Sequence, residues 1–191
     1  MAAVVLHELS HGVVALWCGD DTASQAGRLT LNPLKHMDWT GMVFLPLLLL
    51  FLNAPFVFGW AKPVPISPWK FRSPRRDMIL VGAAGPVSNF LLAIVVAVVV
   101  HGLNPVLPPL VLELLRTGAV LSLALGVFNL LPVPPLDGSR VLAGLLPERW
   151  SAVLIFLERW GIVLVIGLLW LGVTDRLIWP VVEILANWLR L

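Results

Sequence analysis

The stretch Ile79–Val100, ILVGAAGPVSNFLLAIVVAVVV, determines the kind of fold that this chain adopts. It contains no charged residue, and a helix needs about 20 apolar residues to cross the hydrocarbon core of a bilayer. The composition agrees, because 59% of the 191 residues are hydrophobic, only 13% are charged and the mean hydropathy is +0.92. An ordinary soluble domain has about twice that charged fraction. The sequence therefore predicts a polytopic membrane protein whose spans are helices, since a helix satisfies its own backbone groups in lipid.

Further apolar runs outline the rest of the architecture. The run Trp39–Phe58 is interrupted by Pro46 and Pro55, so it either crosses the membrane or forms a re-entrant segment. We expect an all-α protein with about four to six transmembrane or re-entrant helices. The other predicted helices are Thr117–Leu136, which begins near Leu110, Trp160–Thr174, which begins near Trp150, and a last short interfacial helix in Leu177–Leu191.

The chain is predicted to form a single membrane-embedded domain over residues 1–191, with a core over 1–146 and C-terminal helices over 150–191. No internal repeat or low-complexity linker divides it. Two segments favour extended backbone over helix. Residues 26–33 alternate polar and apolar side chains like a short strand. In residues 58–65 each proline pushes its predecessor out of the helical region.

The basic residues indicate which loops face the cytoplasm. The loop over 59–78 is rich in Lys and Arg and has a single acid, whereas the loop over 101–109 has no Lys or Arg. The positive-inside rule therefore places the first loop in the cytoplasm and the second outside. The pI of about 9.2 reflects this topology and contact with anionic lipid headgroups, not binding of nucleic acid. The basic residues of the first loop are Lys62, Lys70, Arg72, Arg75 and Arg76.

The clearest chemical motif is HELSH over residues 7–11, an HExxH pattern. On a helix, His7 and His11 share a face and can bind one metal ion, and Glu8 can reach a metal-bound water as general base. Ionisable residues in an apolar helix are costly, which makes them functional candidates; polar contact between helices is the alternative. Only six residues precede His7, so the helix either is short or begins upstream of Met1.

A third metal ligand is expected, because a catalytic zinc takes three protein ligands and keeps a fourth position for water. Cys18 is the only cysteine, which excludes a CxxC zinc site. The best candidate is Asp137 in NLLPVPPLDG, residues 129–138, where prolines prevent a regular helix. Backbone that is not hydrogen-bonded in a helix is tolerated at membrane depth where it lines a polar cavity. From these residues alone, a turn aspartate before Gly138 is an equally good interpretation.

Several segments taken together match one known family. They are HELSH at 7–11, GRLTLNPLKHMD at 27–38, GWAKPVP at 59–65, AGPVSN at 84–89 and NLLPVPPLDG at 129–138. The combination resembles the small prokaryotic branch of the site-2 protease family of intramembrane zinc metalloproteases. The resemblance covers most of the chain. The chain differs from larger members because the connection over 101–109 has no room for a PDZ module, and the family's longer apolar lead before HExxH is absent.

The resemblance implies one Zn²⁺ per chain, held by the two histidines of HExxH and by Asp137, with Glu8 as general base. It also implies that Asn129 and Asn89 line the substrate cleft and hold the peptide or its developing oxyanion. Hydrogen bonding between helices is the alternative role for Asn129, and packing beside a proline kink is the alternative for Asn89. Residues 59–66 resemble the membrane-associated β element that presents substrate in extended form.

The function implied is that of an intramembrane zinc endopeptidase that cuts membrane-protein substrates within or near a transmembrane segment. The expected surroundings are the lipid bilayer of a prokaryotic cell membrane, with the active site toward the cytoplasm. One alternative is a non-catalytic zinc-binding membrane scaffold, against which the intact Glu8 argues. Another is a small transporter, against which the lack of two related halves argues. Substrate identity and oligomeric state stay open.

Overall fold

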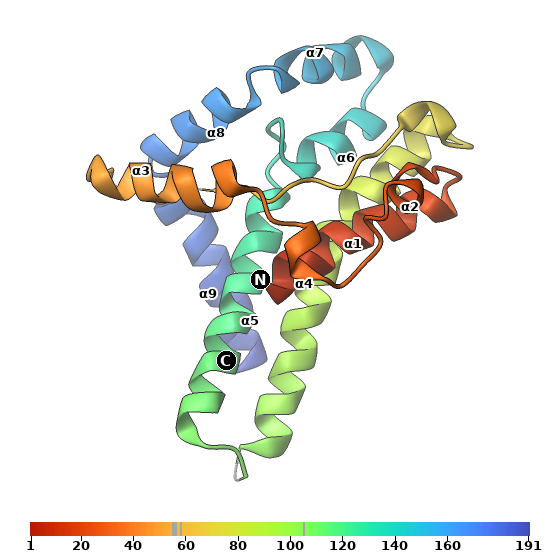
Figure 1. Ribbon diagram of the computed structural model, residues 1–191. Coiled ribbons are helices and arrows are strands. Elements are labelled where there is room, and N and C mark those ends of the chain that lie inside the picture. Colours follow the sequence, from red (N-terminus) through yellow and green to blue (C-terminus); the bar gives the residue numbers. More distant parts are fainter. Residues whose placement is uncertain (55–56, 58, 105) are drawn as a thin grey trace.

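The fold is built from helices, and the computed structural model describes it over residues 1–54, 57, 59–104 and 106–191. Figure 1 shows their arrangement, and no strand is present among the described residues. The α-helices are α1 (Ala2–Trp17), α2 (Thr22–Gln25), α3 (Leu45–Phe51), α4 (Pro74–Leu103), α5 (Pro109–Asn129), α6 (Asp137–Leu145), α7 (Glu148–Glu158), α8 (Gly161–Trp170) and α9 (Trp179–Leu189). Short 3₁₀ turns lie at Pro33–Lys35 and Pro68–Lys70, and π-helical turns at Thr40–Phe44 and Thr174–Ile178.

Helices α4 and α5 form a long antiparallel hairpin, the yellow-green and green pair in Figure 1. Both are long and apolar enough to cross a membrane. The predicted span Ile79–Val100 lies inside α4, and α5 begins near Leu110 as predicted. However, α5 ends at Asn129, before the predicted limit of Leu136, because the prolines that follow cannot continue the ladder.

Fewer helices reach spanning length than the four to six transmembrane or re-entrant helices expected. Besides α4 and α5, the described residues contain one further candidate, the pair α7 and α8, which are bent by 84° relative to each other. The predicted helix from Trp150 to Thr174 is therefore broken. Helix α1 and the apolar helix Thr40–Phe51 are shorter. The predicted segment Trp39–Phe58 includes residues 55, 56 and 58, which lie outside the described residues.

The expected β element is not formed by the described residues. Residues 26–32 are irregular, and Asn32 accepts a hydrogen bond from the Leu34 amide that starts a 3₁₀ turn. Residues 59–66 have no regular secondary structure, and Phe58 lies outside the described part. The alternating prolines of this segment remove the amide donors that a strand ladder needs.

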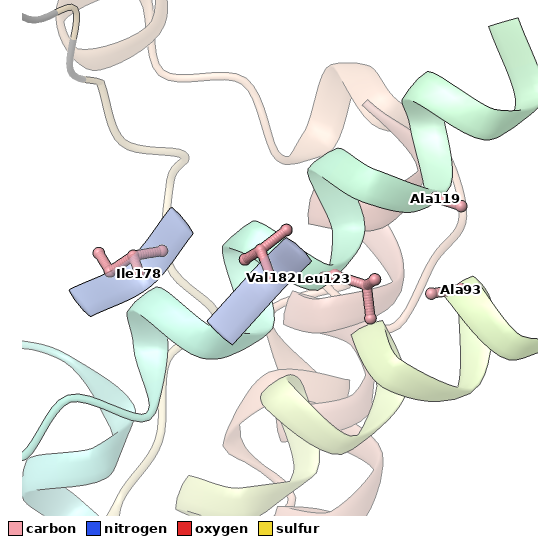
Figure 2. Close-up of a cluster of buried hydrophobic side chains, with 5 residues drawn as sticks. All are labelled: Ala93, Ala119, Leu123, Ile178 and Val182. Atoms are coloured by element: carbon pink, nitrogen blue, oxygen red, sulfur yellow. The ribbon is translucent and has the colours of Figure 1, made fainter. Parts of the chain in front are cut away.

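The last helix packs against the hairpin. Figure 2 shows Ala93 of α4, Ala119 and Leu123 of α5, Ile178 just before α9 and Val182 of α9 gathered in one buried cluster. The predicted last helix is present as α9, and it packs along α5 with Val182 fully buried. This cluster fixes the C-terminal end of the chain to the two long helices.

Helix α4 also carries the two elements that build the candidate site. Helix α1 packs across it, with Ala15 and Val81 buried together in a second apolar cluster. Helix α6 packs on its N-terminal half, where Gly144 lies so close to Ile79 that a side chain would not fit. The N-terminal motif and Asp137 therefore meet on the same stretch of α4.

Candidate metal centre

The two histidines of the HExxH motif point the same way from α1. Both are buried, His7 at 5% and His11 at 3% exposure, and their rings meet edge to face with centroids 4.7 Å apart. Their Nε2 atoms lie 3.1 Å from each other. The spacing of one helical turn produces this geometry, as the sequence predicts.

Asp137 completes the cluster from the opposite direction. Its Oδ2 atom lies 3.0 Å from Nε2 of His7 and 3.1 Å from Nε2 of His11. Donor atoms around a tetrahedral zinc, at bonds of about 2.0–2.1 Å, are separated by about 3.3 Å. The three donor atoms therefore have the spacing and the chemical identity of a three-ligand zinc site that keeps a position open. Among the described residues, these three side chains are the group of His, Cys, Asp or Glu residues that could hold a metal ion.

The other ring nitrogen of each histidine faces a partner on α4. The Nδ1–H of His11 donates to the carbonyl oxygen of Val81 at 2.7 Å. Nδ1 of His7 lies 3.1 Å from the side-chain amide of Asn89. A protonated Nδ1 leaves the lone pair of Nε2 free for a metal. Oδ1 of Asn89 is buried and has no hydrogen-bond partner, so turning the amide by 180° would place Oδ1 where it would accept the Nδ1 proton of His7.

Gly85 lets α1 approach α4 this closely. A Cβ atom at this position would overlap Nε2 of His11 and lie 2.6 Å from Nε2 of His7. Any side chain there would occupy the volume in which the two histidines meet.

The loop between α5 and α6 directs Asp137 toward the histidines. The loop turns through a hydrogen bond from the Leu136 amide to the Val133 carbonyl, and α6 begins at Asp137 itself. Gly138 lies against the carbonyl of Leu130, where no Cβ would fit. Burial would raise the pKa of Asp137, but the two imidazoles outweigh it and hold this pKa well below its ordinary value. A carboxylate at Asp137 is therefore suited to bind a cation.

Glu8 lies beside the three donors, at the wall of a cavity of about 600 Å³. Its carboxylate accepts a hydrogen bond of 2.8 Å from the backbone amide of Val64. The cavity is bounded by α1, by residues 59–66, by the C-terminal end of α5 and by α7 and α8. A cavity with a carboxylate next to three side chains that could bind a metal ion is suited to hydrolysis.

The two predicted asparagines lie in different surroundings. Asn129 lines the cavity, and its amide nitrogen donates to the carbonyl of Leu125 in its own helix at 3.0 Å. Asn89 is fully buried behind His7 and does not line the cavity. The role of Asn129 in substrate binding stays a prediction, and the position of Asn89 favours support of a ligand.

Several groups that contact the candidate site were not predicted from the sequence. The carbonyl of Val81 and the amide of Val64 are backbone groups, which carry no signature in the sequence. Arg140, 3.9 Å from Oδ1 of Asp137 and 3.8 Å from Glu158, lies one turn beyond the predicted ligand on α6. The pair Gly85-Pro86 was the available signal for a close helix contact.

Comparison with known proteins gives the family. The model of peptidase family M50 matches residues 1–107 and 109–171. The chain is 37% identical over 194 residues to the "Putative zinc metalloprotease YwhC" of Bacillus subtilis, covering 96% of this chain and 83% of that protein. It is 28% identical to the "Putative zinc metalloprotease Rip2" of Mycolicibacterium smegmatis over 88% of this chain and 64% of the relative. The "Zinc metalloprotease MJ0392" of Methanocaldococcus jannaschii is 34% identical over 41% of this chain and 22% of its own length.

The chain thus spans less than two thirds of the Rip2 protein and a small part of MJ0392. No solved structure gives a significant match. The match to the family model extends over most of the chain, including the HExxH helix and Asp137, and it confirms the resemblance that the sequence motifs predict. This chain belongs to peptidase family M50, the site-2 protease family.

Proposed function

We propose that this protein is an intramembrane zinc endopeptidase that hydrolyses peptide bonds within or near transmembrane segments of membrane-protein substrates. The observation that carries the proposal is the convergence of Asp137 on His7 and His11, next to Glu8, at a cavity. Family membership supports a zinc protease, and the spanning length of α4 and α5 supports a site enclosed by membrane helices.

Three residues would hold the metal ion, one Zn²⁺ per chain. His7 and His11 offer neutral imidazole nitrogens and Asp137 offers a carboxylate oxygen, which is a usual donor set for catalytic zinc. Zinc bound there would supply Lewis acidity, polarising the scissile carbonyl and lowering the pKa of a water toward about 7. Val81 and Asn89 keep the two imidazoles oriented for this task.

Glu8 acts as the proton carrier. Its carboxylate takes a proton from the attacking water, so that the water oxygen forms the new bond to the carbonyl carbon. The same carboxylic acid then gives the proton to the leaving amide nitrogen as the carbon–nitrogen bond breaks. The hydrogen bond from the Val64 amide fixes the carboxylate beside the histidines. No other residue is needed to balance the proton transfers.

The substrate is a locally unwound segment of a membrane protein. In a helix the carbonyl is hidden in the i→i−4 ladder, so the scissile bond must be presented in extended form. One wall of the cavity consists of non-helical backbone at Gly59–Ile66, against which an extended chain can lie. Lys62 lies within this wall and Lys70 lies just after it, which by the positive-inside rule favours a cavity open toward the cytoplasm of a prokaryotic cell.

The test is the cleavage of a membrane-protein substrate reconstituted in lipid vesicles, with wild type compared to Glu8→Gln. Gln cannot accept the proton, so we expect cleavage to fall by about 10²–10⁴-fold while zinc content is unchanged. Glu113→Gln is the matched control, because Glu113 is exposed on α5 and distant from the cavity lining. Full activity of Glu8→Gln would refute the role of Glu8. A zinc-loaded wild type that cuts no membrane substrate would favour the scaffold.

A further inference from the structure

Residues 27–36 enclose a buried arginine that belongs neither to the metal ligands nor to the cavity lining. Arg28 is 8% exposed. Its guanidinium donates hydrogen bonds to the carbonyl of Lys35, to that of Lys62 at 2.6 Å and to that of Pro63 at 3.2 Å. No carboxylate of the described residues lies within ion-pair distance of it. Burying a charge without a counter-ion is costly, and the three carbonyl oxygens that accept from the planar fork offset part of this cost.

The same segment also binds residue 62 through the backbone. The amide of Lys62 donates to the carbonyl of His36 at 3.0 Å. His36 is itself only 1% exposed, and its Nε2 atom lies 2.9 Å from the carbonyl of Thr30. Residues 62 and 63 are therefore held against the 27–36 segment in two ways. The Lys62 amide donates to His36, and the Lys62 and Pro63 carbonyls accept from Arg28.

The peptide group between Pro63 and Val64 connects this arginine to the candidate base. Its carbonyl oxygen accepts from Arg28, and its amide donates to Oε2 of Glu8 at 2.8 Å. The peptide group is planar, so its two ends cannot rotate independently. Because Pro63 and Pro65 have no amide hydrogen, Val64 offers the one backbone donor of this triplet.

We propose that Arg28 is a positioning residue for Glu8 that acts through the Pro63–Val64 peptide group. Arg28 holds the carbonyl edge of this plane, and the opposite edge then directs the amide hydrogen of Val64 at the Glu8 carboxylate. The same contacts hold the 59–64 wall of the cavity in place. The inference rests on the proposed function for its effect on turnover, whereas the link from Arg28 to Val64 is measurable without it.

The experiment compares the wild-type chain with its Arg28→Lys and Arg76→Lys variants, all loaded with zinc and reconstituted in lipid. Lys keeps the charge but cannot reach carbonyls of two segments with one planar fork. Arg76 is exposed at the start of α4, so Arg76→Lys makes the same chemical change away from the loop. Amide hydrogen exchange is measured at the individual amides of residues 59–66, together with zinc content and cleavage kinetics.

We expect Arg28→Lys to speed exchange at Val64 by about tenfold or more, and to leave zinc content unchanged. With a cleaved substrate, kcat should fall by about tenfold or more, and a rise in KM is expected beside it because the same contacts hold the 59–64 wall of the cavity. Unchanged exchange at Val64, or an equal effect of Arg76→Lys, would overturn the proposal. A rise in KM with kcat unchanged would also overturn it, because the proton transfer by Glu8 would then be unaffected.

A second variant keeps the test decisive if Arg28→Lys loses its fold, which faster exchange throughout α4 and α5 would report. Glu8→Ala leaves Arg28 untouched and removes the acceptor of Val64. Exchange at Val64 should then accelerate while Lys62 stays protected. No acceleration at Val64 would overturn the proposal. If wild type cleaves no substrate, the proposed function fails, and the exchange results still decide the link between Arg28 and Val64.

Discussion

The Oδ2 atom of Asp137 lies 3.1 Å from Nε2 of His11, although 126 residues separate them in the sequence. Neither α1 nor α6 produces this meeting alone. Helix α4 lies between them, with Gly85 beneath the two histidines and Gly144 of α6 packed on its first turns. The meeting of the three donor atoms therefore depends on α4.

The contact between α1 and α4 has no space for a side chain at Gly85. Gly85→Ala should displace His7 and His11 and lower zinc affinity by about tenfold or more, because overpacking a closed contact forces both helices apart. Gly102→Ala is the matched control in the same helix, since a Cβ at Gly102 meets no atom within 4 Å. Zinc titration of both variants measures the difference. Equal affinities would show that the contact is looser than described.

The amide of Asn89 should act by accepting the Nδ1 proton of His7. Asn89→Leu removes the acceptor and should weaken zinc binding by about 10–100-fold. Asn89→Asp keeps an acceptor and should restore most of the affinity. Competition with a zinc chelator measures both constants. Equal losses in the two variants would contradict a role in orienting the imidazole.

Asn129 should contribute to turnover rather than to metal binding. It lines the cavity and contacts none of the three donor atoms. If its side chain supports the developing oxyanion, Asn129→Ala should reduce kcat by about 10²–10³-fold with zinc content unchanged. Asn187→Ala, at an exposed position on α9, is the control. Wild-type kcat in Asn129→Ala would remove this residue from the chemistry.

The junction after α1 should make stability depend on pH. Burial would raise the pKa of Asp20, but hydrogen bonds from the Ser67 amide at 2.6 Å and from Thr22 outweigh it and hold the pKa below its ordinary value. The ionised carboxylate therefore stabilises the folded state above the unfolded pKa of about 3.9, and this contribution is lost as the pH falls through the lower, folded pKa.

Asp20→Asn should accordingly destabilise the protein by about 1–3 kcal/mol at neutral pH, and the difference from wild type should shrink below about pH 4. Thermal unfolding in detergent at several pH values measures it. Asp175→Asn, at an exposed aspartate, should show no such trend. A difference that grows toward acid pH would contradict the assigned role of Asp20.

The spans and the ligands follow from the sequence because their signals are local. A charge-free run such as Ile79–Val100 predicts a spanning helix from its length, and one helical turn between His7 and His11 predicts a shared face. The break between α7 and α8, and the missing strand at 59–66, depend on packing and on where backbone donors find partners, which composition does not encode.

The supporting parts of the site were beyond sequence reasoning for the same reason. The site uses the backbone carbonyl of Val81 and the backbone amide of Val64. Every residue has a backbone carbonyl, and every residue except proline has a backbone N–H. Only the fold therefore determines which of these groups reach the site. Asn89 was predicted as a site residue, but its motif does not tell whether it faces a cleft or a ligand. The structure places it behind His7.

The most direct measurement is the zinc content of purified wild type beside His7→Ala and Asp137→Ala. The account predicts about one zinc per chain in wild type and loss of zinc in both variants, because each removes one of three ligands. Folding is checked in parallel by the exchange protection of α4 and α5. Zinc retained in Asp137→Ala, or a folded wild type that binds no zinc, would contradict the three-ligand site.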